Sequence, residues 1–259
     1  MAGRRRLDVE MMRRGLVASR AQAAALIDEG QVLVAGAVAE KPSRLVAPGE
    51  PVELHSPPRY VSRGGLKLEA ALEAFEVEVR GRRCLDAGSS TGGFTDCLLQ
   101  HGARRVIALD VGYGQLHPRM RSDPRVITIE RRNARDLTEL PFAPGLITCD
   151  VSFISARKAL PPALRLAARD WEALVLVKPQ FEAGRSEAPK GVVREAAVHR
   201  RVLHEFCAAA RGWDARVLGV VDSGLPGPKG NREFIVHLHE SQETAEPDDL
   251  DRWIDEAVE

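Results

Sequence analysis

The chain has 259 residues, 44% of them hydrophobic and 29% charged, which is typical of a globular protein with an α/β core and room for a small second domain. It contains no apolar run of about 18 residues, and its first arginines precede no apolar segment, so a membrane-spanning helix and a secretory signal are not expected. The net charge of zero conceals an asymmetry, because residues 240–259 carry −8 and the remainder +8. The first twenty residues alone carry +4, which predicts a polyanionic partner, although a solvated charged face is the alternative.

Residues 1–58 have the pattern of a compact α+β module. Ser19 and Gln22 form a capping box, which predicts the start of a helix. The expected elements are two helices followed by two short strands, at 7–16, 19–30, 31–34 and 51–54. Pro57 and Pro58 mark the end of the module, and residues 59–63 are expected to be a linker.

Residues 64–240 alternate between strand-like and helical patterns, which predicts an α/β domain with a doubly wound, mostly parallel sheet. The expected strands are 83–86, 105–110, 126–129, 146–150, 173–178, 215–221 and 233–238, and the expected helices are 66–75, 94–101, 155–168 and 194–210. In such sheets ligands bind at the carboxyl ends of the strands, beside the first strand. Asp86, Asp110, Asp150 and Lys178 fall at those ends. Residues 241–259 are expected to form an acidic C-terminal helix or tail.

The segment Cys84-Leu-Asp-Ala-Gly-Ser-Ser-Thr-Gly-Gly-Phe94 has the profile of a buried strand, a glycine-rich turn and a helix start. Its glycine spacing fits neither the pyrophosphate-binding G-x-G-x-x-G nor a phosphate loop. It suits a nucleoside ligand whose amino-acid end lies over the loop, with Asp110 placed to bind a ribose. Packing alone would explain Gly88, but Asp86, the glycine pair and Asp110 together favour a ligand site.

Two lysines and two acids are candidates for chemistry: Lys67, Asp150, Lys178 and Glu233. Lys67 and Glu233 could also be solvated surface residues, whereas a lysine that closes the buried strand 173–178 is harder to explain without a function. Such a set suits group transfer to an alcohol, since a lysine can accept the hydroxyl proton or stabilise the developing alkoxide. The sequence leaves these two roles open.

The four cysteines form no C-x-x-C pair, which indicates reduced structural thiols in a cytoplasmic protein. His237 and His239 share a predicted strand face, but no cysteine or acid cluster completes a metal site.

The N-terminal module resembles the RNA-binding domain first seen in a small-subunit ribosomal protein, the S4 fold. The resemblance rests on Arg-Leu-Asp, Arg-Arg-Gly-Leu, Ser-Arg, Leu-Ile, Gly-x-Val-x-Val and Lys-Pro-Ser, in that order along residues 6–43. It implies a basic face for structured RNA, with Arg4, Arg6, Arg20 and Lys41 at the family's positively charged positions. Phosphate contacts from such residues position a protein on RNA.

The rest of the chain resembles the FtsJ-type ribose 2′-O-methyltransferases, and the whole chain resembles the TlyA family of ribosomal RNA methyltransferases, some of which are labelled haemolysins. The motifs are the segment 84–94, Asp110-Val-Gly-Tyr-Gly-Gln-Leu116, Asp150-Val-Ser-Phe-Ile-Ser155 and Leu176-Val-Lys-Pro-Gln-Phe-Glu182. The resemblance implies a Rossmann-like methyltransferase sheet behind an S4-like domain. It also implies S-adenosylmethionine as the methyl donor and a cytidine ribose in ribosomal RNA, within the small or large subunit or both, as the acceptor.

The resemblance further implies roles for particular residues. Lys67, Asp150, Lys178 and Glu233 match the family's catalytic tetrad. The cofactor-binding positions would be Asp86, Gly88, Ser89, Gly92, Gly93, Phe94, Asp110, Val111, Asn133, Ala134 and Asp150. Neither a metal, a membrane nor an obligate protein partner is implied.

Two other functions compete with this interpretation. One is a non-catalytic RNA-binding factor for ribosome assembly that keeps a cofactor fold, although binding alone would require neither Asp150 nor Glu233. The other is a haemolysin, which no strongly amphipathic or membrane-spanning segment supports.

Overall fold

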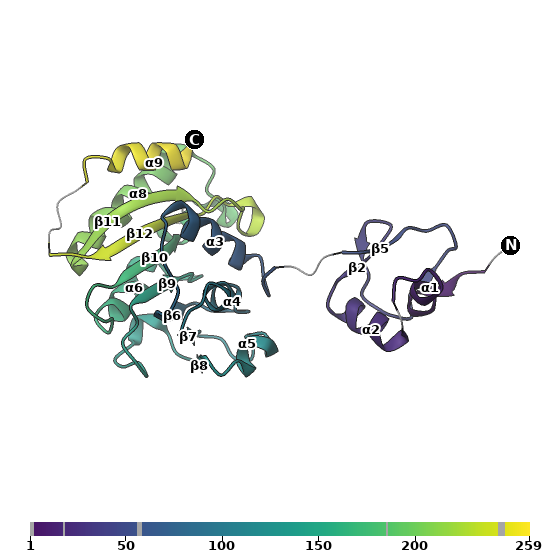
Figure 1. Cartoon of the computed structure of the whole chain (residues 1–259). Coiled ribbons are helices and arrows are strands. Elements are labelled where there is room, and N and C mark those ends of the chain that lie inside the picture. Colours follow the sequence, from purple (N-terminus) through teal and green to yellow (C-terminus); the bar gives the residue numbers. More distant parts are fainter. Residues whose placement is uncertain (1–2, 18, 56–58, 185, 243–246) are drawn as a thin grey trace. The chain divides into compact units, whose positions relative to one another are not determined.

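The computed structural model describes residues 3–17, 19–55, 59–184, 186–242 and 247–259. The chain divides into two compact units, Met1–Arg59 and Tyr60–Glu259 (Figure 1). The predicted boundary at Pro57 and Pro58, and part of the acidic C-terminal stretch (243–246), lie outside the described residues.

The first unit has two helices and two small antiparallel sheets around a compact core. Its helices are α1 (Leu7–Arg13) and α2 (Arg20–Asp28), and its strands are β1 (Arg5–Arg6), β2 (Val32–Val34), β3 (Ala37–Val38), β4 (Leu45–Val46) and β5 (Val52–Leu54). Strand β1 pairs with β4, and the other three form a sheet in the order β3-β2-β5. The predicted cap of α2 is confirmed, since the Ser19 hydroxyl accepts a hydrogen bond of 3.1 Å from the backbone N–H of Gln22. Helix α1 ends at Arg13, and Gly15, the residue expected to end it, follows with a φ of 73°.

The second unit is built on a seven-stranded sheet in the order β11-β12-β10-β9-β6-β7-β8. The strands are β6 (Arg83–Ala87), β7 (Arg105–Leu109), β8 (Val126–Ile129), β9 (Leu146–Cys149), β10 (Glu172–Val177), β11 (Ala215–Asp222) and β12 (Phe234–Glu240). Only β12 runs against its neighbours, so the predicted mostly parallel sheet is confirmed. The order reverses at β6, which makes the carboxyl ends of β6, β7 and β9 the expected ligand edge.

Helices cover both faces of this sheet (Figure 1). They are α3 (Gly64–Ala74), α4 (Gly93–Gln100), α5 (Pro118–Ser122), α6 (Ala156–Leu164), α7 (Pro179–Glu182), α8 (Ala196–Ala210) and α9 (Leu250–Val258). Single 3₁₀ turns lie at η1 (Ala134–Asp136), η2 (Pro189–Gly191), η3 (Arg211–Trp213) and η4 (Pro228–Gly230). Helices α3, α4 and α5 pack on one face, and α6, α8 and α9 on the other. Helix α6 ends at Leu164, shorter than the predicted 155–168.

The buried side chains of the strands alternate between these two faces. Leu85 and Ala87 of β6 contribute to the core under α6 and α8, whereas Cys84 contributes to the core under α3 and α4. All four cysteines are free and buried, so they act as small apolar core residues.

Candidate active site

The loop after β6 lies directly against the loop after β9. Gly88 has a φ of 90°, and a Cβ atom there would lie 2.2 Å from the carbonyl oxygen of Asp150. Any side chain at this position would therefore separate the two loops. Gly92, with a φ of 94°, caps α4, whose first residue is Gly93. The glycine-rich motif thus brings the ends of β6 and β9 and the start of α4 together.

The first cavity at this edge has a volume of about 420 Å³. Six of the predicted cofactor-binding residues line it: Gly88, Asp110, Val111, Asn133, Ala134 and Asp150. The Asp110 carboxylate is held by two backbone N–H groups, at 2.8 Å from Ser90 to Oδ2 and at 2.6 Å from Gly112 to Oδ1. Because each carboxylate oxygen has two lone pairs, both keep the capacity to accept a further hydrogen bond from a ligand.

A second cavity of about 340 Å³ adjoins the first and shares Gly88, Ser90 and Asp150 with it. Six further predicted site residues line the second cavity, in addition to the shared Asp150: Ser89, Gly93, Phe94, Lys67, Lys178 and Glu233. The four candidates for chemistry therefore meet in one hollow, although they come from α3, the end of β9, the end of β10 and the start of β12.

The four residues form two lysine–carboxylate pairs. Lys67 Nζ lies 2.5 Å from Glu233 Oε2, and Lys178 Nζ lies 2.5 Å from Asp150 Oδ1. Both lysine side chains are only 10% exposed, and burial of an ammonium group is tolerated when a carboxylate compensates its charge. Lys178 also donates to the Ser152 hydroxyl at 2.9 Å. Its contact with Asp150 is an ion pair that lacks hydrogen-bond geometry, and Asp150 Oδ1 is buried without a hydrogen-bond partner among the described residues, so Lys178 keeps N–H donors for a ligand.

Glu233 is held from three sides. Besides Lys67, the side-chain amide of Gln180 in α7 donates to Oε1 at 3.2 Å. The backbone of Gly227 is so close that a Cβ atom there would lie 2.0 Å from Oε1. The loop that contains Gly227 therefore closes over the carboxylate and restricts it to one orientation.

Two of the predicted cofactor-binding residues line neither cavity. Gly92 lies behind the loop, where a Cβ atom would meet Leu116. Asp86 is fully buried inside β6 and accepts hydrogen bonds from the hydroxyls of Thr95 at 2.7 Å and Thr148 at 3.2 Å. Burial raises the pKa of Asp86 to about 7, so its carboxyl group is largely neutral at acidic pH.

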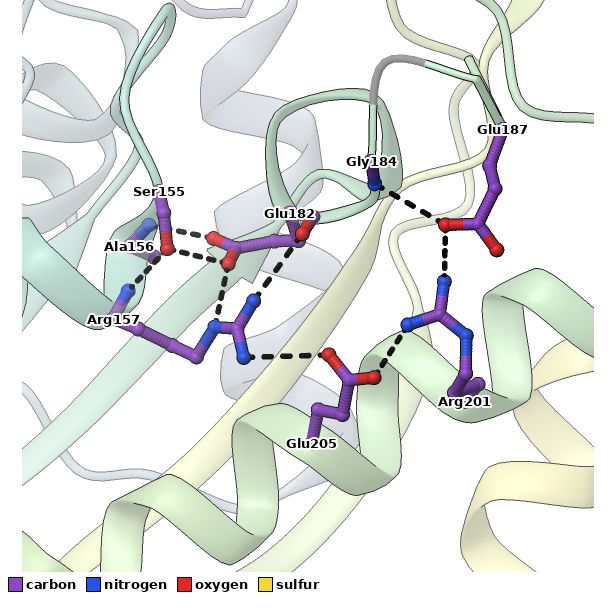
Figure 2. A network of polar contacts seen from close by, with 8 residues as sticks. All are labelled: Ser155, Ala156, Arg157, Glu182, Gly184, Glu187, Arg201 and Glu205. Carbon is purple, nitrogen blue, oxygen red and sulfur yellow. Dashed lines mark hydrogen bonds and ion pairs between the residues drawn. The ribbon is translucent and has the colours of Figure 1, made fainter.

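A polar network fixes the wall of the first cavity (Figure 2). The buried Glu182, at the end of α7, accepts from the Ser155 hydroxyl at 2.5 Å, from the Ala156 N–H at 2.6 Å and from Arg157 Nε at 3.0 Å. Figure 2 shows the network continuing through Glu205 to Arg201 on α8. Residues 150–154 line the first cavity, so Lys178 and Glu182 hold the two ends of this wall from the two ends of α7.

Sequence reasoning missed several residues at this edge, among them Ser152, Gln180 and Glu182, although the motifs 150–155 and 176–182 contain them. It also missed Phe153, which lines the first cavity while its side chain is 93% exposed and its φ is 65°. A positive φ is uncommon for a bulky residue and is often found at functional sites. The exposed ring is available to stack on a planar ligand.

The four RNA-binding candidates all lie in the first unit. Arg6 and Arg20 are ion-paired to the buried Asp8, and Arg4 and Lys41 are exposed at the surface. Among the described residues, no cluster of three or more histidines, cysteines or acids could hold a metal ion.

Comparison with known proteins connects this geometry to a family. A model described as FtsJ-like methyltransferase matches residues 60–240, and a model described as S4 domain matches residues 5–52. The "16S/23S rRNA (cytidine-2'-O)-methyltransferase TlyA" of Mycobacterium tuberculosis is 46% identical over 254 residues, which cover 95% of this chain and 93% of that protein. "Hemolysin A" of Brachyspira hyodysenteriae is 37% identical over 237 residues, with 90% and 99% covered. A solved Streptococcus thermophilus structure, provisionally named a hemolysin, is 37% identical with a TM-score of 0.76, covering 99% of this chain and 96% of that one.

The sheet order, the paired cavities and the matched models define an FtsJ-like methyltransferase with an N-terminal S4 domain. The similarity to the Mycobacterium tuberculosis protein extends along nearly the whole length of the chain. It shows that the chain belongs to a narrower group, the TlyA family. The fold class and the family expected from the sequence are both confirmed.

Proposed function

We propose that this protein transfers a methyl group from S-adenosylmethionine to the 2′-hydroxyl of a cytidine ribose in ribosomal RNA. The observation that carries the proposal is the meeting of two cavities at Gly88, Ser90 and Asp150. One cavity contains the backbone-fixed carboxylate of Asp110, and the other contains two lysine–acid pairs. The name of the Mycobacterium tuberculosis relative supports the choice of nucleoside and of RNA.

The first cavity fits the methyl donor. Asp110 has two fixed oxygens with free lone pairs, as the two hydroxyls of a ribose require. Asn133 and Ala134 line the cavity beyond Asp110 and would contact the adenine. The methionine end would lie over Gly88 and Gly93, where the first N–H groups of α4 favour a carboxylate. When bound, the donor supplies an electrophilic methyl group on a sulfonium centre.

The second cavity would hold the acceptor ribose. The hydroxyl oxygen forms the new bond to carbon, and its proton must leave to a group of the protein. As a cation, Lys178 would donate an N–H to that oxygen and stabilise the developing alkoxide while the carboxylate of Asp150 accepts the hydroxyl proton. As a neutral amine, Lys178 would accept the proton itself and Asp150 would balance the charge of the resulting ammonium group. Lys67 and Glu233, fixed by Gln180, would orient the ribose from the opposite side. Alignment of the hydroxyl with the methyl group would account for much of the remaining rate.

The division of labour follows the two units. Residues 1–58 would supply RNA affinity through Arg4, Arg6, Arg20 and Lys41, and residues 60–240 would hold the donor and the chemistry. Residues 60–63, predicted from the sequence to be part of a linker, belong to the second unit, and Ser62 and Arg63 line the second cavity. The exposed ring of Phe153 offers a surface on which a base turned out of its helix could stack. The acidic residues 241–259 and the basic start resemble the longer family form, for which both ribosomal subunits are the implied targets.

The direct test is methyl transfer from labelled S-adenosylmethionine to purified small subunits, large subunits and whole ribosomes that lack the modification. We expect label on cytidine in RNA from at least one subunit, in a form that resists alkaline hydrolysis at that nucleotide, as a 2′-O-methyl group does. Label in protein, or on a base instead of a ribose, would contradict the proposal.

The same experiment separates the competing functions. An assembly factor would bind the subunits but transfer no label to their RNA. A haemolysin would release haemoglobin from erythrocytes as purified protein, and a Lys178→Ala variant would do so equally well. Within the described residues, no helix has the length and apolarity to cross a bilayer.

A further inference from the structure

We propose that Asp8 is a positioning residue for RNA binding, which holds Arg6 and Arg20 so that their outer guanidinium edges face the phosphates of the RNA. The inference rests on the proposed RNA-binding role of the first unit. It assigns a binding function to an acid on a surface whose partner is itself negatively charged.

Both arginines use the same two donors, although Arg6 reaches both carboxylate oxygens of Asp8 and Arg20 reaches Oδ2 alone. Arg6 donates to Asp8 from Nε at 3.1 Å and from Nη2 at 3.0 Å. Arg20 donates from Nε at 3.1 Å and from Nη2 at 2.8 Å. Each guanidinium thus uses its inner edge, and its Nη1 atom has no hydrogen-bond partner among the described residues. The outer edge, formed by Nη1 and Nη2, is the pair of donors that grips a phosphate with two parallel hydrogen bonds.

Asp8 is buried, whereas the two arginines that it binds are about half exposed. The Asp8 side chain is 4% exposed, while those of Arg6 and Arg20 are 46% and 59% exposed. Asp8 also accepts from the backbone N–H of Val9, which fixes its carboxylate at the start of α1. The hydrogen bonds from Arg6 and Arg20 lower the pKa of Asp8 to about 2, so the acid stays charged at neutral pH. An anchored, charged acid under two half-exposed guanidinium groups restrains these long side chains before RNA arrives, which reduces the entropy lost on binding.

The neighbouring acid binds two arginines in two different ways. Glu10 is also buried, and it accepts from Nε and Nη2 of Arg13, at 2.8 and 2.6 Å, in the way that Asp8 accepts from Arg6, with Arg13 49% exposed. Arg14 donates to Glu10 at 2.8 Å. Arg14, however, continues to the carbonyl oxygens of Glu50 at 2.8 Å and Pro48 at 3.2 Å, and its side chain is only 20% exposed. The donors of its outer edge already bind backbone carbonyls of the protein, so Arg14 connects α1 to the loop before β5. Arg6 and Arg20 have no such second partner among the described residues, which is why we assign them, and not Arg14, to the RNA.

For Asp8→Asn, an effect of net charge alone and a positioning role predict opposite changes in RNA affinity. Removal of an acid raises the net charge by one and, by charge alone, strengthens binding to a polyanion. If Asp8 positions the arginines, binding weakens instead. We expect full-length Asp8→Asn to bind purified ribosomal subunits about fivefold to tenfold more weakly than the wild type at near-physiological salt. The matched control is Glu53→Gln, which removes one charge from an exposed acid of β5 and should bind as the wild type or slightly more tightly.

A cycle with Arg20 tests whether Asp8 acts through the arginines. Arg20→Ala should weaken binding strongly in the wild type but much less in the Asp8→Asn background, because the contact is already impaired there. A purely structural role for Asp8 predicts the same loss from Arg20→Ala in both backgrounds. Additive effects, or tighter binding by a folded Asp8→Asn variant, would overturn the proposal.

A second variant does not depend on the folding of an altered Asp8. Arg20→Lys keeps the charge, but an ammonium group lacks the two edges of a guanidinium group. It cannot bind Asp8 with one pair of N–H donors and present a second pair to a phosphate. We expect it to lose nearly as much subunit affinity as Arg20→Ala, and wild-type affinity would contradict the proposal. S-adenosylmethionine binding, measured by calorimetry, should be unchanged in all of these variants. If the wild type itself bound subunits no better than unrelated RNA, the proposed function would fail instead of the role of Asp8.

Discussion

Asp8 in the first unit and Glu182 in the second are both buried carboxylates that accept hydrogen bonds from arginine. Their partners differ. Asp8 binds two side chains that are about half exposed, whereas Glu182 binds Arg157, 31% exposed, together with a hydroxyl and a backbone N–H at the start of α6. On our proposal, the same chemistry prepares a surface for RNA in the first unit, whereas it fixes a cavity wall in the second. What decides between these outcomes is whether the donors of the arginine remain exposed or are used up inside the fold.

The largest expected effect separates chemistry from binding. Lys178→Ala should reduce methyl transfer to ribosomes by about 10²–10⁴-fold, because the acceptor oxygen loses its nearest cationic or basic group. Donor binding by calorimetry and subunit binding by filter assay should stay near wild-type values. The control is Lys158→Ala on the exposed side of α6, which should be fully active. Substantial transfer by Lys178→Ala would mean that the catalytic centre lies elsewhere.

Within the second unit, the buried Glu182 and the more exposed Glu205 should contribute differently to stability. Glu182→Ala should lower the free energy of unfolding by about 3 kcal/mol, because it leaves Arg157 without its main partner and the buried Ala156 N–H at the start of α6 without its acceptor. Glu205→Ala, which removes an acid 39% exposed in the same network, should cost less than about 1 kcal/mol. Denaturant titration of the two variants measures the difference. Equal losses would show that Glu182 does not anchor the cavity wall.

The donor site gives the next effect. Asp110→Ala should weaken S-adenosylmethionine binding by about 1–3 kcal/mol, since the ligand loses hydrogen bonds to a charged acceptor. Asp136→Ala, at an acid 61% exposed, is the control that should bind the donor normally. Isothermal titration calorimetry on folded protein decides the matter, and unchanged affinity in Asp110→Ala would remove this residue from the donor site.

The smallest effect concerns pH. The pKa of Asp86 is about 7 in the folded chain, against about 4 for an ordinary aspartate, so between these values only the folded state keeps the proton. The contribution of Asp86 to stability is therefore complete below pH 4 and is lost as the pH rises through 7. Asp86→Asn removes this dependence. Between pH 5 and 6, the free energy of unfolding of the wild type should fall by on the order of 1 kcal/mol relative to that of the variant. If the two free energies instead change in parallel with pH, Asp86 is ionised in the folded protein.

These effects differ in how far the sequence alone could foresee them. The sheet, its direction and the convergence of Lys67, Asp150, Lys178 and Glu233 follow from alternating patterns and from the rule that parallel strands end at one edge. Asp86 shows the limit of that rule. Strand β6 runs one residue beyond the predicted end, so Asp86 lies inside the strand and faces Thr95, not the cavity.

The positioning acids were harder to foresee. Asp8 lies among arginines, where a charge pair on the surface is the ordinary interpretation, and only the packing of α1 against α2 reveals its burial. Glu182 acts across 26 residues on a helix start that no local pattern connects with it. Helix α6, by contrast, contains Pro161 and Pro162, a signal that could have shortened the prediction.

The pair Lys67–Glu233 joins residues 166 positions apart, and this separation has a consequence for synthesis on the ribosome. Strand β12, which follows Glu233, is the last strand among the described residues, yet it inserts between β10 and β11. A nascent chain can form β6 to β10 early, but the edge of β10 remains unpaired and Lys67 lacks its carboxylate until residues 233–240 have emerged. Completion of the sheet and pairing of Lys67 with Glu233 therefore coincide, and we expect a translation product that stops before residue 233 to lack both the complete sheet and the proposed catalytic pair.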